Sequence, residues 1–396
     1  MSQLRDESAS SGSLAGLAIA DVAATVNLQR IQMVAWRDLD DPEAGGSELH
    51  AAKVAHHWAA AGLQVGLRTS TAASKPPDVK RDGYRVARRS GRYGVFPRVM
   101  LDGMSGRLGD HDAMVEIWNG MPFFSPLWSR KPTIVFLHHV HAEMWKLVLS
   151  KGLAHMGWFL ESRVAPKLYR HSRIVTLSES SRDEIVDFLG LPPDNISVVP
   201  PGIDPAFSPG GARSADPLVV AVGRLVRVKR FDLFIEAVSR LKSRYPTLRA
   251  VVVGEGSERA ELEAHIGAVG AQDWISLPGR VDDRTLVDLY RSAWLLASCS
   301  QREGWGMTIT EAAACGTPTV ASDIAGHRDA VIHGRSGFLA GDVEELAAYM
   351  DAILSDGDLR AKLVDGALRH ASRFSWEATA RGTFEVLALE VADRTR

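Results

Sequence analysis

The sequence predicts an α/β protein made of two Rossmann-like, doubly wound domains that face a cleft. Short apolar runs of strand length alternate with amphipathic runs of helical length through both halves of the chain. The segment Pro200-Pro201-Gly202-Ile203-Asp204 separates the halves, because it is dense in residues that continue neither a helix nor a strand. Glycines and polar residues follow the apolar runs, which is typical of strand ends that form a ligand site.

The length and composition of the chain suit this architecture. Its 396 residues are enough for about two or three domains. We expect a flexible tail over residues 1–28, a first domain over residues 29–204, a second over residues 205–375 and a final helix over residues 376–396. A net charge of −2 excludes a protein whose whole surface binds nucleic acid, and we expect no nucleic-acid partner.

Cysteine usage and the N-terminal segment favour a cytoplasmic protein. The two cysteines, Cys299 and Cys315, provide no disulfide framework and indicate a reducing compartment. Asp21 interrupts the apolar residues 13–27, so we expect no secretory signal. No apolar stretch is long enough and free enough of charge to predict a transmembrane helix.

The first domain opens with a predicted strand over residues 31–35, a glycine turn at Gly45-Gly46, a helix over residues 47–61 and a strand over residues 64–67. This βαβ unit places the glycine turn where a doubly wound sheet binds phosphate. A bare pair of glycines before a helix fits a simple tight turn equally well.

Further strands are predicted over residues 114–118, 133–137, 174–177 and 196–199, with a helix over residues 181–189. The second of these strands ends at His138, at the sheet edge where ligands bind in such folds. His139 and His141 follow, yet the run does not have the spacing of a familiar zinc set. We therefore interpret His138 as a site residue and expect no zinc.

Two Asp-x-Asp pairs, Asp38 with Asp40 and Asp110 with Asp112, carry the carboxylate oxygens that hard metal ions prefer. Each pair is isolated in a polar connection, where solvated acids are commoner. We interpret all four as solvated acids and expect no bound metal.

Two stretches of the first domain, residues 75–107 and 144–170, combine cations with aromatic residues. Such a combination is typical of contact with an anionic membrane or a phosphorylated acceptor. A solvated face is the alternative for the first stretch, and a packed core helix for the second. We expect any peripheral membrane contact to involve residues 80–100 and 144–170.

The second domain repeats the alternation. Strands are predicted over residues 218–222, 250–253, 274–277, 293–297 and 319–321, with helices over residues 231–241, 258–269 and 284–292. The strand ends are followed by Gly223-Arg224 with Lys229, by Gly254-Glu255-Gly256 and by Gly279-Arg280. Parallel strands end at one edge of a sheet, so these groups converge, and the two cations Arg224 and Lys229 suit a diphosphate.

A further strand end leads into two carboxylates, Glu303 and Glu311, that bracket a loop containing Gly304 and Gly306. Amides at a helix start attract phosphate, and carboxylates accept hydrogen bonds from sugar hydroxyls. The alternative is a capping box formed by Thr308 and Glu311, which explains neither Glu303 nor the glycines.

Together these residues resemble the GT-B retaining glycosyltransferases of family 4, over nearly the whole chain after the tail. The most specific resemblance is the E-x7-E motif, here Glu303 to Glu311. The chain also resembles the family at Phe374-Ser375-Trp376, before a last helix that in such proteins crosses back to the first domain. It departs from the family at Pro201, where the hinge usually carries Asn.

The resemblance implies a role for each matching residue. Arg224 and Lys229 would neutralise the diphosphate of a nucleotide-sugar donor. Glu311 would bind the ribose, Glu303 the donor sugar, and His138 would lie near the anomeric carbon. The backbone around Arg280 would contact the base. The other donor-binding residues implied are Gly45, Gly46, Gly223, Gly254, Gly304, Gly306, Met307 and Thr308.

The resemblance also implies a reaction: transfer of a hexose-type sugar from a UDP- or GDP-sugar to a hydroxyl of a lipid, glycan or small-molecule acceptor. The transfer would retain the anomeric configuration and need no metal cofactor. The leaving phosphate would accept the acceptor's proton, so no general base is named. A sugar-nucleotide epimerase, a phosphorylase and a nucleotide-sugar binding protein are the alternatives on the same fold.

Overall fold

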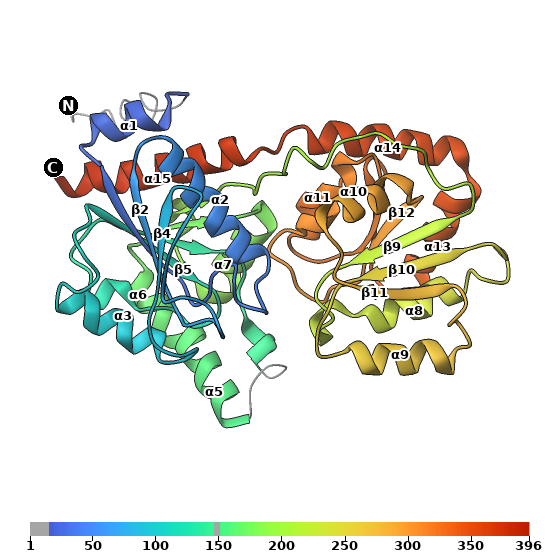
Figure 1. Ribbon diagram of the computed structural model, residues 1–396, viewed down its shortest axis with the longest axis horizontal. Helices are drawn as coiled ribbons and strands as arrows, with labels where there is room; N and C mark the ends of the chain where they lie inside the picture. Colours follow the sequence, from blue (N-terminus) through green and yellow to red (C-terminus); the bar gives the residue numbers. More distant parts are fainter. Residues whose placement is uncertain (1–15, 146–150, 396) are drawn as a thin grey trace, which may run out of the picture. The chain divides into compact units, whose positions relative to one another are not determined.

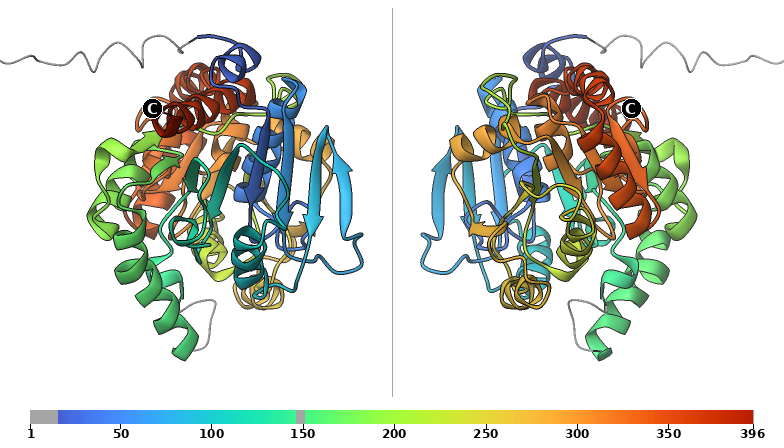
Figure 2. Two further views of the ribbon diagram at one scale, coloured as in Figure 1. Left: turned by 90° about the vertical axis from the view of Figure 1, so that its left-hand side faces the viewer. Right: turned by 90° about the vertical axis from the view of Figure 1, so that its right-hand side faces the viewer.

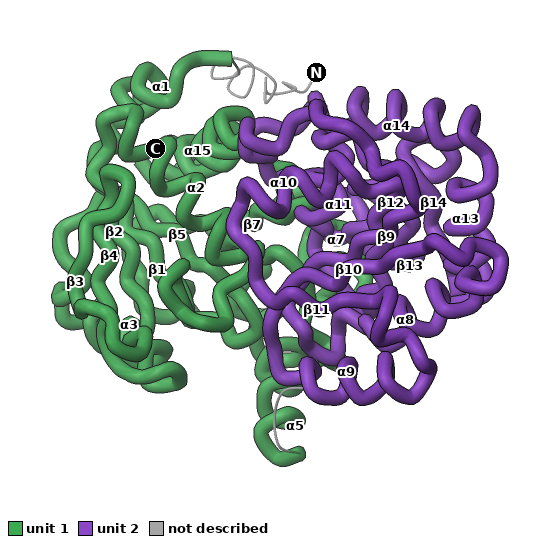
Figure 3. The backbone as a smooth tube through the Cα atoms, turned by 45° about the vertical axis from the view of Figure 1, so that its right-hand side comes forward, with its two compact units in different colours: residues 1–177, 182–200, 376–396 green, residues 178–181, 201–375 purple. Residues whose placement is uncertain are grey.

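The computed structural model describes residues 16–145 and 151–395 and divides into two units (Figures 1 and 3). Unit 1 comprises residues 1–177, 182–200 and 376–396, and unit 2 comprises residues 178–181 and 201–375. The chain therefore passes from one unit to the other within the proline-rich connection, and returns between Ser375 and Trp376. Each unit has its own sheet and its own hydrophobic core.

Unit 1 is built on an eight-stranded sheet with the order β3-β4-β2-β1-β5-β6-β7-β8. All neighbouring strands are parallel except β3 and β4. The residues of β5 and β6 are buried throughout, as expected for parallel strands that are covered on both faces. The strands are β1 (Arg30–Val34), β2 (Gln64–Thr69), β3 (Asp78–Arg81), β4 (Tyr84–Arg88), β5 (Ala113–Trp118), β6 (Thr133–Leu137), β7 (Arg173–Thr176) and β8 (Ile196–Val198).

The helices of unit 1 include the last helix of the chain, α15 (Trp376–Thr395), which packs against α2 (Gly46–Ala60). Trp58 of α2 donates its indole N–H to the carbonyl of Ala380 at 2.8 Å, and Phe384 lies edge-on to the same indole. The other helices are α1 (Ile19–Thr25), α3 (Val95–Met104), α5 (Lys151–Phe159), α6 (Ala165–Tyr169) and α7 (Glu179–Leu189), with short 3-10 turns at η1 (Ser125–Leu127), η2 (Ala142–Met144) and η4 (Pro193–Asn195).

The flexible tail predicted over residues 1–28 is too long. Helix α1 lies within it, and its Val22 and Ala23 are buried in the core of unit 1. Leu28, which precedes β1, is buried in the same core. Burial of these apolar side chains in the core holds α1 and Leu28 in place. Residues 1–15 lie outside the described part of the chain.

The basic stretch of residues 75–107 contains a hairpin, β3–β4, and helix α3, none of which was predicted. The hairpin turns at Asp82-Gly83, where both residues have positive φ, as a tight two-residue turn requires. It forms the outer edge of the sheet (Figure 2). Five arginines of the stretch over residues 75–107 form ion pairs within unit 1: Arg81, Arg88, Arg89, Arg92 and Arg98. These five arginines therefore stabilise the fold and do not form a free basic surface.

The interpretation of Asp38 as a solvated acid is wrong. Its side chain is buried, and Arg88, also buried, donates to both of its carboxylate oxygens, at 3.2 and 2.6 Å. Arg81 pairs with Asp38 at 3.2 Å and with Asp40 at 2.6 Å. Asp112 in turn accepts hydrogen bonds from the side chain and backbone of Arg30, both at 2.8 Å. Buried acids of this kind require partners, and arginines provide them.

We expect Arg88→Met to lower the free energy of unfolding of unit 1 by about 3 kcal/mol, because it leaves Asp38 buried without its closest cation. Hydrogen exchange of the β2 and β4 amides in increasing denaturant measures unit 1 alone. Arg89→Met is the matched control, since Arg89 and its partner Asp78 are both partly exposed and such pairs contribute about 1 kcal/mol or less. Equal losses in the two variants would contradict this account of Asp38.

Unit 2 is built on a six-stranded, wholly parallel sheet with the order β11-β10-β9-β12-β13-β14. The order reverses between β9 and β12, which is the switch point of a doubly wound fold. The strands are β9 (Leu218–Val222), β10 (Arg249–Val253), β11 (Ile275–Gly279), β12 (Leu295–Ser298), β13 (Thr319–Ser322) and β14 (Gly337–Ala340). The helices are α8 (Phe231–Ser239), α9 (Arg259–Ala268), α10 (Asp283–Ser292), α11 (Met307–Ala314), α12 (His327–Ala330), α13 (Val343–Ser355) and α14 (Gly357–Ala371), with a 3-10 turn at η5 (Arg227–Lys229).

The two sheets confirm the predicted α/β class with two doubly wound domains. Cys299 and Cys315 are both buried free thiols of unit 2. Within the described ranges, no helix combines the length and the apolar character that crossing a bilayer requires. In the same ranges, no three His, Cys, Asp or Glu side chains gather in a way that could hold a metal ion.

Candidate functional site

The switch point of unit 2 brings two predicted site segments together. Gly223 and Arg224 follow β9 directly, and the loop that contains Glu303 follows β12. The amide of Gln301 donates to the carbonyl of Val228 at 2.8 Å, which ties the β12 loop to the 3-10 turn after β9. This backbone link places Lys229 beside Glu303.

Lys229 and Glu303 form an ion pair at this point. Ser300 donates a second hydrogen bond to the same carboxylate oxygen, Oε1, at 2.9 Å. The lysine and glutamate side chains are 21% and 18% exposed, so the pair is accessible but mostly shielded from solvent. Burial acts to raise the pKa of Glu303, but the charge of Lys229 and these hydrogen bonds outweigh it and lower the pKa to about 2. The glutamate is therefore ionised at neutral pH and can accept hydrogen bonds.

His327, at the start of α12, lies among the same strand ends and was not predicted. Its ring is fully buried, with Nδ1 at 2.9 Å from the carbonyl of Ser322 and Nε2 at 3.3 Å from Oγ of Ser298. Burial lowers the pKa of this imidazole. The carbonyl contact requires a proton on Nδ1, and through its contacts with Ser322 and Ser298 the ring supports the ends of β12 and β13.

The turns after β9, β10 and β11 lie in backbone contact. A Cβ on Gly254 would come within 1.8 Å of the carbonyl oxygen of Gly223, so only glycine fits there. The amide of Gly254 donates to the carbonyl of Gly279 at 2.9 Å, which joins the next turn. Arg280 follows that turn and is exposed. The predicted convergence of Gly223, Gly254 and Arg280 at one sheet edge is therefore present.

The loop after Glu303 ends at Gly306, the N-cap of α11. Gly306 has a φ of 101°, in the left-handed region that favours glycine. The amides of Met307 and Thr308 belong to the first turn of the helix, where no intrahelical acceptor exists. Gly304, before the cap, is buried. Such a helix start can bind an anion, and it follows Glu303 closely in the chain.

The capping-box alternative for Thr308 and Glu311 is wrong. The helix begins at Met307, so Thr308 is already inside it and no side chain caps Gly306. Glu311 lies in the second turn, where its Oε2 accepts from the hydroxyl of Tyr290 at 3.4 Å. Burial raises the pKa of Glu311 to about 7, against the opposing hydrogen bond from Tyr290. The second carboxylate therefore titrates near neutral pH, unlike Glu303.

Unit 1 carries the remaining predicted residues. Gly45 is the N-cap of α2, and its amide donates to Oε2 of Glu48 at 2.8 Å. Gly46 is the first residue of the helix, so its amide has no intrahelical acceptor. Asn119, directly after β5, donates to Oγ of Ser47 at 2.8 Å. The glycine turn is therefore a fixed helix start at the end of the central strands.

His138, directly after β6, is buried and faces His50 of α2, with Nε2 of His138 at 3.1 Å from Nδ1 of His50. Burial lowers the pKa of His50 to about 3 and that of His138 well below its usual value. Both rings are neutral at physiological pH, and one donates a hydrogen bond to the other. His50 was not predicted, because nothing in the local sequence distinguishes it within an amphipathic helix.

The predicted residues thus form two sets. In unit 2, the structure brings together Lys229 with Glu303, and Gly223 with Gly254 and the turn before Arg280. In unit 1, Gly45 and Gly46 form the start of α2, and His138 contacts His50 of the same helix. A cation, an ionised carboxylate and helix amides at one sheet edge can bind a diphosphate and an adjoining polyol.

Two family models match consecutive parts of the chain. Residues 44–207 match "Glycosyltransferase Family 4", and residues 204–370 match "Glycosyl transferases group 1". The D-inositol 3-phosphate glycosyltransferase of Acidothermus cellulolyticus is 30% identical over 391 residues, which cover 89% of this chain and 87% of that protein.

Solved structures share the fold. Sucrose-phosphate synthase from Thermosynechococcus elongatus superposes with a TM-score of 0.75 at 19% identity, over 89% of this chain and 96% of the other. HepE of Anabaena, in complex with UDP-glucose, superposes with a TM-score of 0.69 at 19% identity, over 92% of this chain and 99% of the other. The chain is a glycosyltransferase of family 4 with the GT-B fold, and its second half matches the group 1 model.

Proposed function

We propose that this glycosyltransferase moves a hexose-type sugar from a UDP- or GDP-sugar to a hydroxyl group of its acceptor, with retention at the anomeric carbon. The observation that carries the proposal is the Lys229–Glu303 pair at the switch point of unit 2. It sets a cation for the diphosphate beside a carboxylate for the sugar hydroxyls. The complex of HepE with UDP-glucose supports a UDP-sugar as the first donor to test.

Each residue has a place in this proposal. Lys229 and Arg224 neutralise the diphosphate, assisted by the amides of Gly46 and of residues 306–308. Glu303 accepts hydrogen bonds from the donor sugar, and Glu311 accepts from the ribose. His138 lies near the anomeric carbon, and the backbone at Arg280 contacts the base. Lys229, Arg224 and the helix amides stabilise negative charge as it develops on the leaving diphosphate, which is the main requirement of the reaction.

The bond changes need no protein base. The bond between the anomeric carbon and the diphosphate oxygen breaks, and the acceptor oxygen forms a new bond on the same face of the sugar. The leaving phosphate oxygen takes the proton of the acceptor hydroxyl. Fixed cations and amides supply the stabilisation, and we propose that no metal cofactor is required.

The acceptor belongs to the class of hydroxyl compounds that carry lipid, glycan or small polyol groups. The relative from Acidothermus cellulolyticus is named for D-inositol 3-phosphate, so a phosphorylated polyol is the first acceptor to test. We include in the proposal a cytoplasmic location with peripheral contact to an anionic membrane, which would give access to an acceptor at a lipid surface.

The test is to incubate the protein with UDP- and GDP-sugars and with D-inositol 3-phosphate or other hydroxyl acceptors, with and without EDTA. The proposal predicts acceptor-dependent release of a nucleoside diphosphate, an α-linked product from an α-linked donor, and equal rates with EDTA. Conversion of the donor to its epimer would instead show an epimerase. A requirement for inorganic phosphate would show a phosphorylase, and binding without turnover a binding protein.

The affinity for UDP should depend on pH through Glu311. Its pKa of about 7 in the free protein means that the carboxyl is protonated below neutral pH, whereas ribose hydroxyls donate to the ionised form. Binding then requires loss of a proton, so affinity should rise with pH and level off above about pH 7, changing about tenfold per unit below it. Calorimetric titration with UDP between about pH 5.5 and pH 8.5 measures this.

Glu311→Gln is the control, because glutamine keeps the size and a hydrogen-bonding oxygen but does not titrate. The variant should lose the pH dependence that belongs to the protein and keep that of the nucleotide's own phosphate. An identical pH profile in the variant and the natural protein would remove Glu311 from the ribose site.

A further inference from the structure

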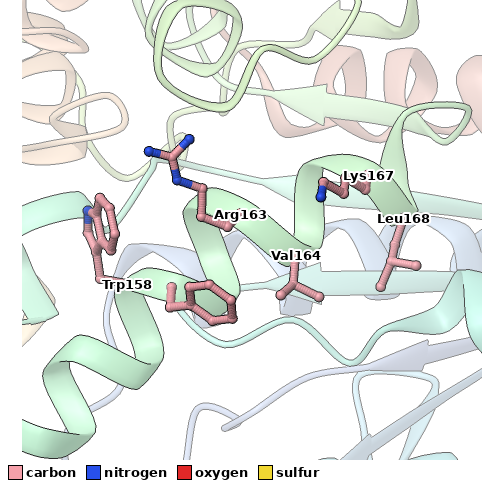
Figure 4. Close-up of a pocket in the computed structure, with 6 residues that line it drawn as sticks. Trp158, Arg163, Val164, Lys167 and Leu168 are labelled. Carbon is pink, nitrogen blue, oxygen red and sulfur yellow. The ribbon is translucent and has the colours of Figure 1, made fainter.

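Unit 1 exposes a face on which large apolar side chains lie among cations. The face is formed by α5, the π-helical turn η3 (Leu160–Val164) and α6. Met156 and Phe159 are each 53% exposed, and Trp158 is 37% exposed. A shallow hollow of about 500 Å³ lies on this face (Figure 4), lined by Trp158, Phe159, Arg163, Val164, Lys167 and Leu168. We refer to these six residues and Met156 as the α5–α6 face.

The opposite side of the same helices is anchored in unit 1. Glu161 is buried and accepts from the amides of His141 and Ala142, at 2.7 and 2.9 Å, and from the indole of Trp145 at 2.8 Å. A Cβ on Gly157 would meet the Trp145 ring at 2.7 Å, so the two pack directly. One tryptophan, Trp145, therefore faces the core, while Trp158 remains outside. The alternative for residues 144–170, a helix whose aromatic side chains pack into a core, holds for Trp145 but not for Trp158.

The exposed charge of the α5–α6 face is wholly positive. Arg163 and Lys167 are exposed, and the Arg163 guanidinium lies 5.9 Å from the Trp158 ring. Between residues 151 and 171 the only acid is Glu161, which is buried. By contrast, five arginines of the stretch over residues 80–100 are paired within the fold. Lys80 and Arg85 of that stretch remain exposed, on β3 and β4, whereas Arg163 and Lys167 lie beside exposed aromatic side chains on the α5–α6 face.

The form of this surface suits a bilayer better than a small ligand. Its apolar side chains and cations lie side by side along one run of helix, and α5 projects away from the sheet of unit 1 (Figures 1 and 2). A ligand pocket would instead enclose a few converging polar groups. An amphipathic helix with aromatic and aliphatic side chains beside Lys and Arg lies in a membrane interface and prefers anionic lipids.

We propose that the α5–α6 face is the surface by which this protein docks on an anionic lipid bilayer, with Met156 and Phe159 entering the interface and Arg163 and Lys167 contacting lipid phosphates. The proposal gives a location to the peripheral membrane contact included in the proposed function. Docking does not require glycosyl transfer, so vesicle binding and enzyme activity can fail independently.

The test is sedimentation of the full-length protein with vesicles of phosphatidylcholine alone and of phosphatidylcholine mixed with phosphatidylglycerol. The protein should sediment with the anionic vesicles at about 50 mM salt, and much less at about 500 mM. Arg163→Gln with Lys167→Gln should weaken the partition coefficient about thirtyfold, because each cation near an anionic bilayer contributes about fivefold. Met156→Ser should weaken it about fivefold.

Matched controls exist in the same unit. Lys80→Gln with Arg85→Gln removes two exposed cations from β3 and β4, and Met104→Ser removes a methionine that is 71% exposed on α3. Both controls should bind as the natural protein does. No sedimentation with anionic vesicles at low salt would overturn the proposal. So would equal losses in the control and α5–α6 variants, or equal binding to uncharged vesicles, since the cations would then have no role.

Discussion

Replacing Lys229 by methionine is expected to lower kcat/KM for the nucleotide sugar about a thousandfold, or ~4 kcal/mol. Lys229 is the cation nearest the carboxylate of the site, and it lies in the turn after β9 at the switch point. Methionine has a similar length but cannot neutralise a diphosphate, in the bound donor or in the transition state. It also leaves Glu303 without its main counter-charge, so the pKa of Glu303 should rise.

Steady-state kinetics with varied donor measure this effect, and UDP binding by calorimetry separates ground-state affinity from turnover. Lys362→Met is the matched control, because Lys362 is an exposed lysine on α14 of the same unit. Its kinetics should be those of the natural protein. If Lys229→Met bound UDP as tightly as the natural protein does, the diphosphate would not lie against this lysine.

Replacing Glu303 by glutamine is expected to lower kcat about a thousandfold while UDP affinity changes by less than about tenfold. Glu303 is ionised, with its pKa lowered to about 2, and it accepts from Lys229 and Ser300. In the proposed complex its acceptor oxygens hold the sugar rather than the nucleotide. Loss of the negative charge should therefore destabilise the cation-like sugar during transfer more than it weakens binding of the diphosphate.

Comparison of kcat with the UDP dissociation constant decides this point, with Glu261→Gln on the exposed face of α9 as the matched control. An unchanged kcat at saturating donor would show that Glu303 does not bind the sugar. Because Lys229 and Glu303 contact each other, the double variant should lose less than the sum of the two single losses.

The alternation of strands and helices was predictable because it depends on local pattern. The apolar runs of β6, β9 and β10 mark parallel strands that are covered on both faces. The β3–β4 hairpin was not predicted, because its many cations are typical of a solvated or binding surface. Asp82-Gly83 is nevertheless a turn signal. Only the folded chain places Asp38 and Asp40 beside those arginines.

The residues of the candidate site that lie after strands were predictable from the sequence, but several of their side-chain partners were not. Gly223 follows β9 directly, and Lys229 and Glu303 lie in the connections after β9 and β12, so their meeting at one sheet edge follows from topology. Ser300, Tyr290, His327 and His50 were not predictable, because their contacts join residues whose sequence carries no local signal. The capping-box alternative failed because the start of α11 is set by the left-handed Gly306 and not by Thr308.

A crystal structure of the protein with a UDP-sugar donor would show directly whether the switch point of unit 2 binds the nucleotide sugar. The diphosphate should lie within hydrogen-bonding distance of Lys229 Nζ, with the ribose at Glu311 and the donor sugar at Glu303. The Lys229–Glu303 ion pair would then be opened or shared with the ligand. A nucleotide bound away from the switch point between β9 and β12, with that ion pair untouched, would contradict it.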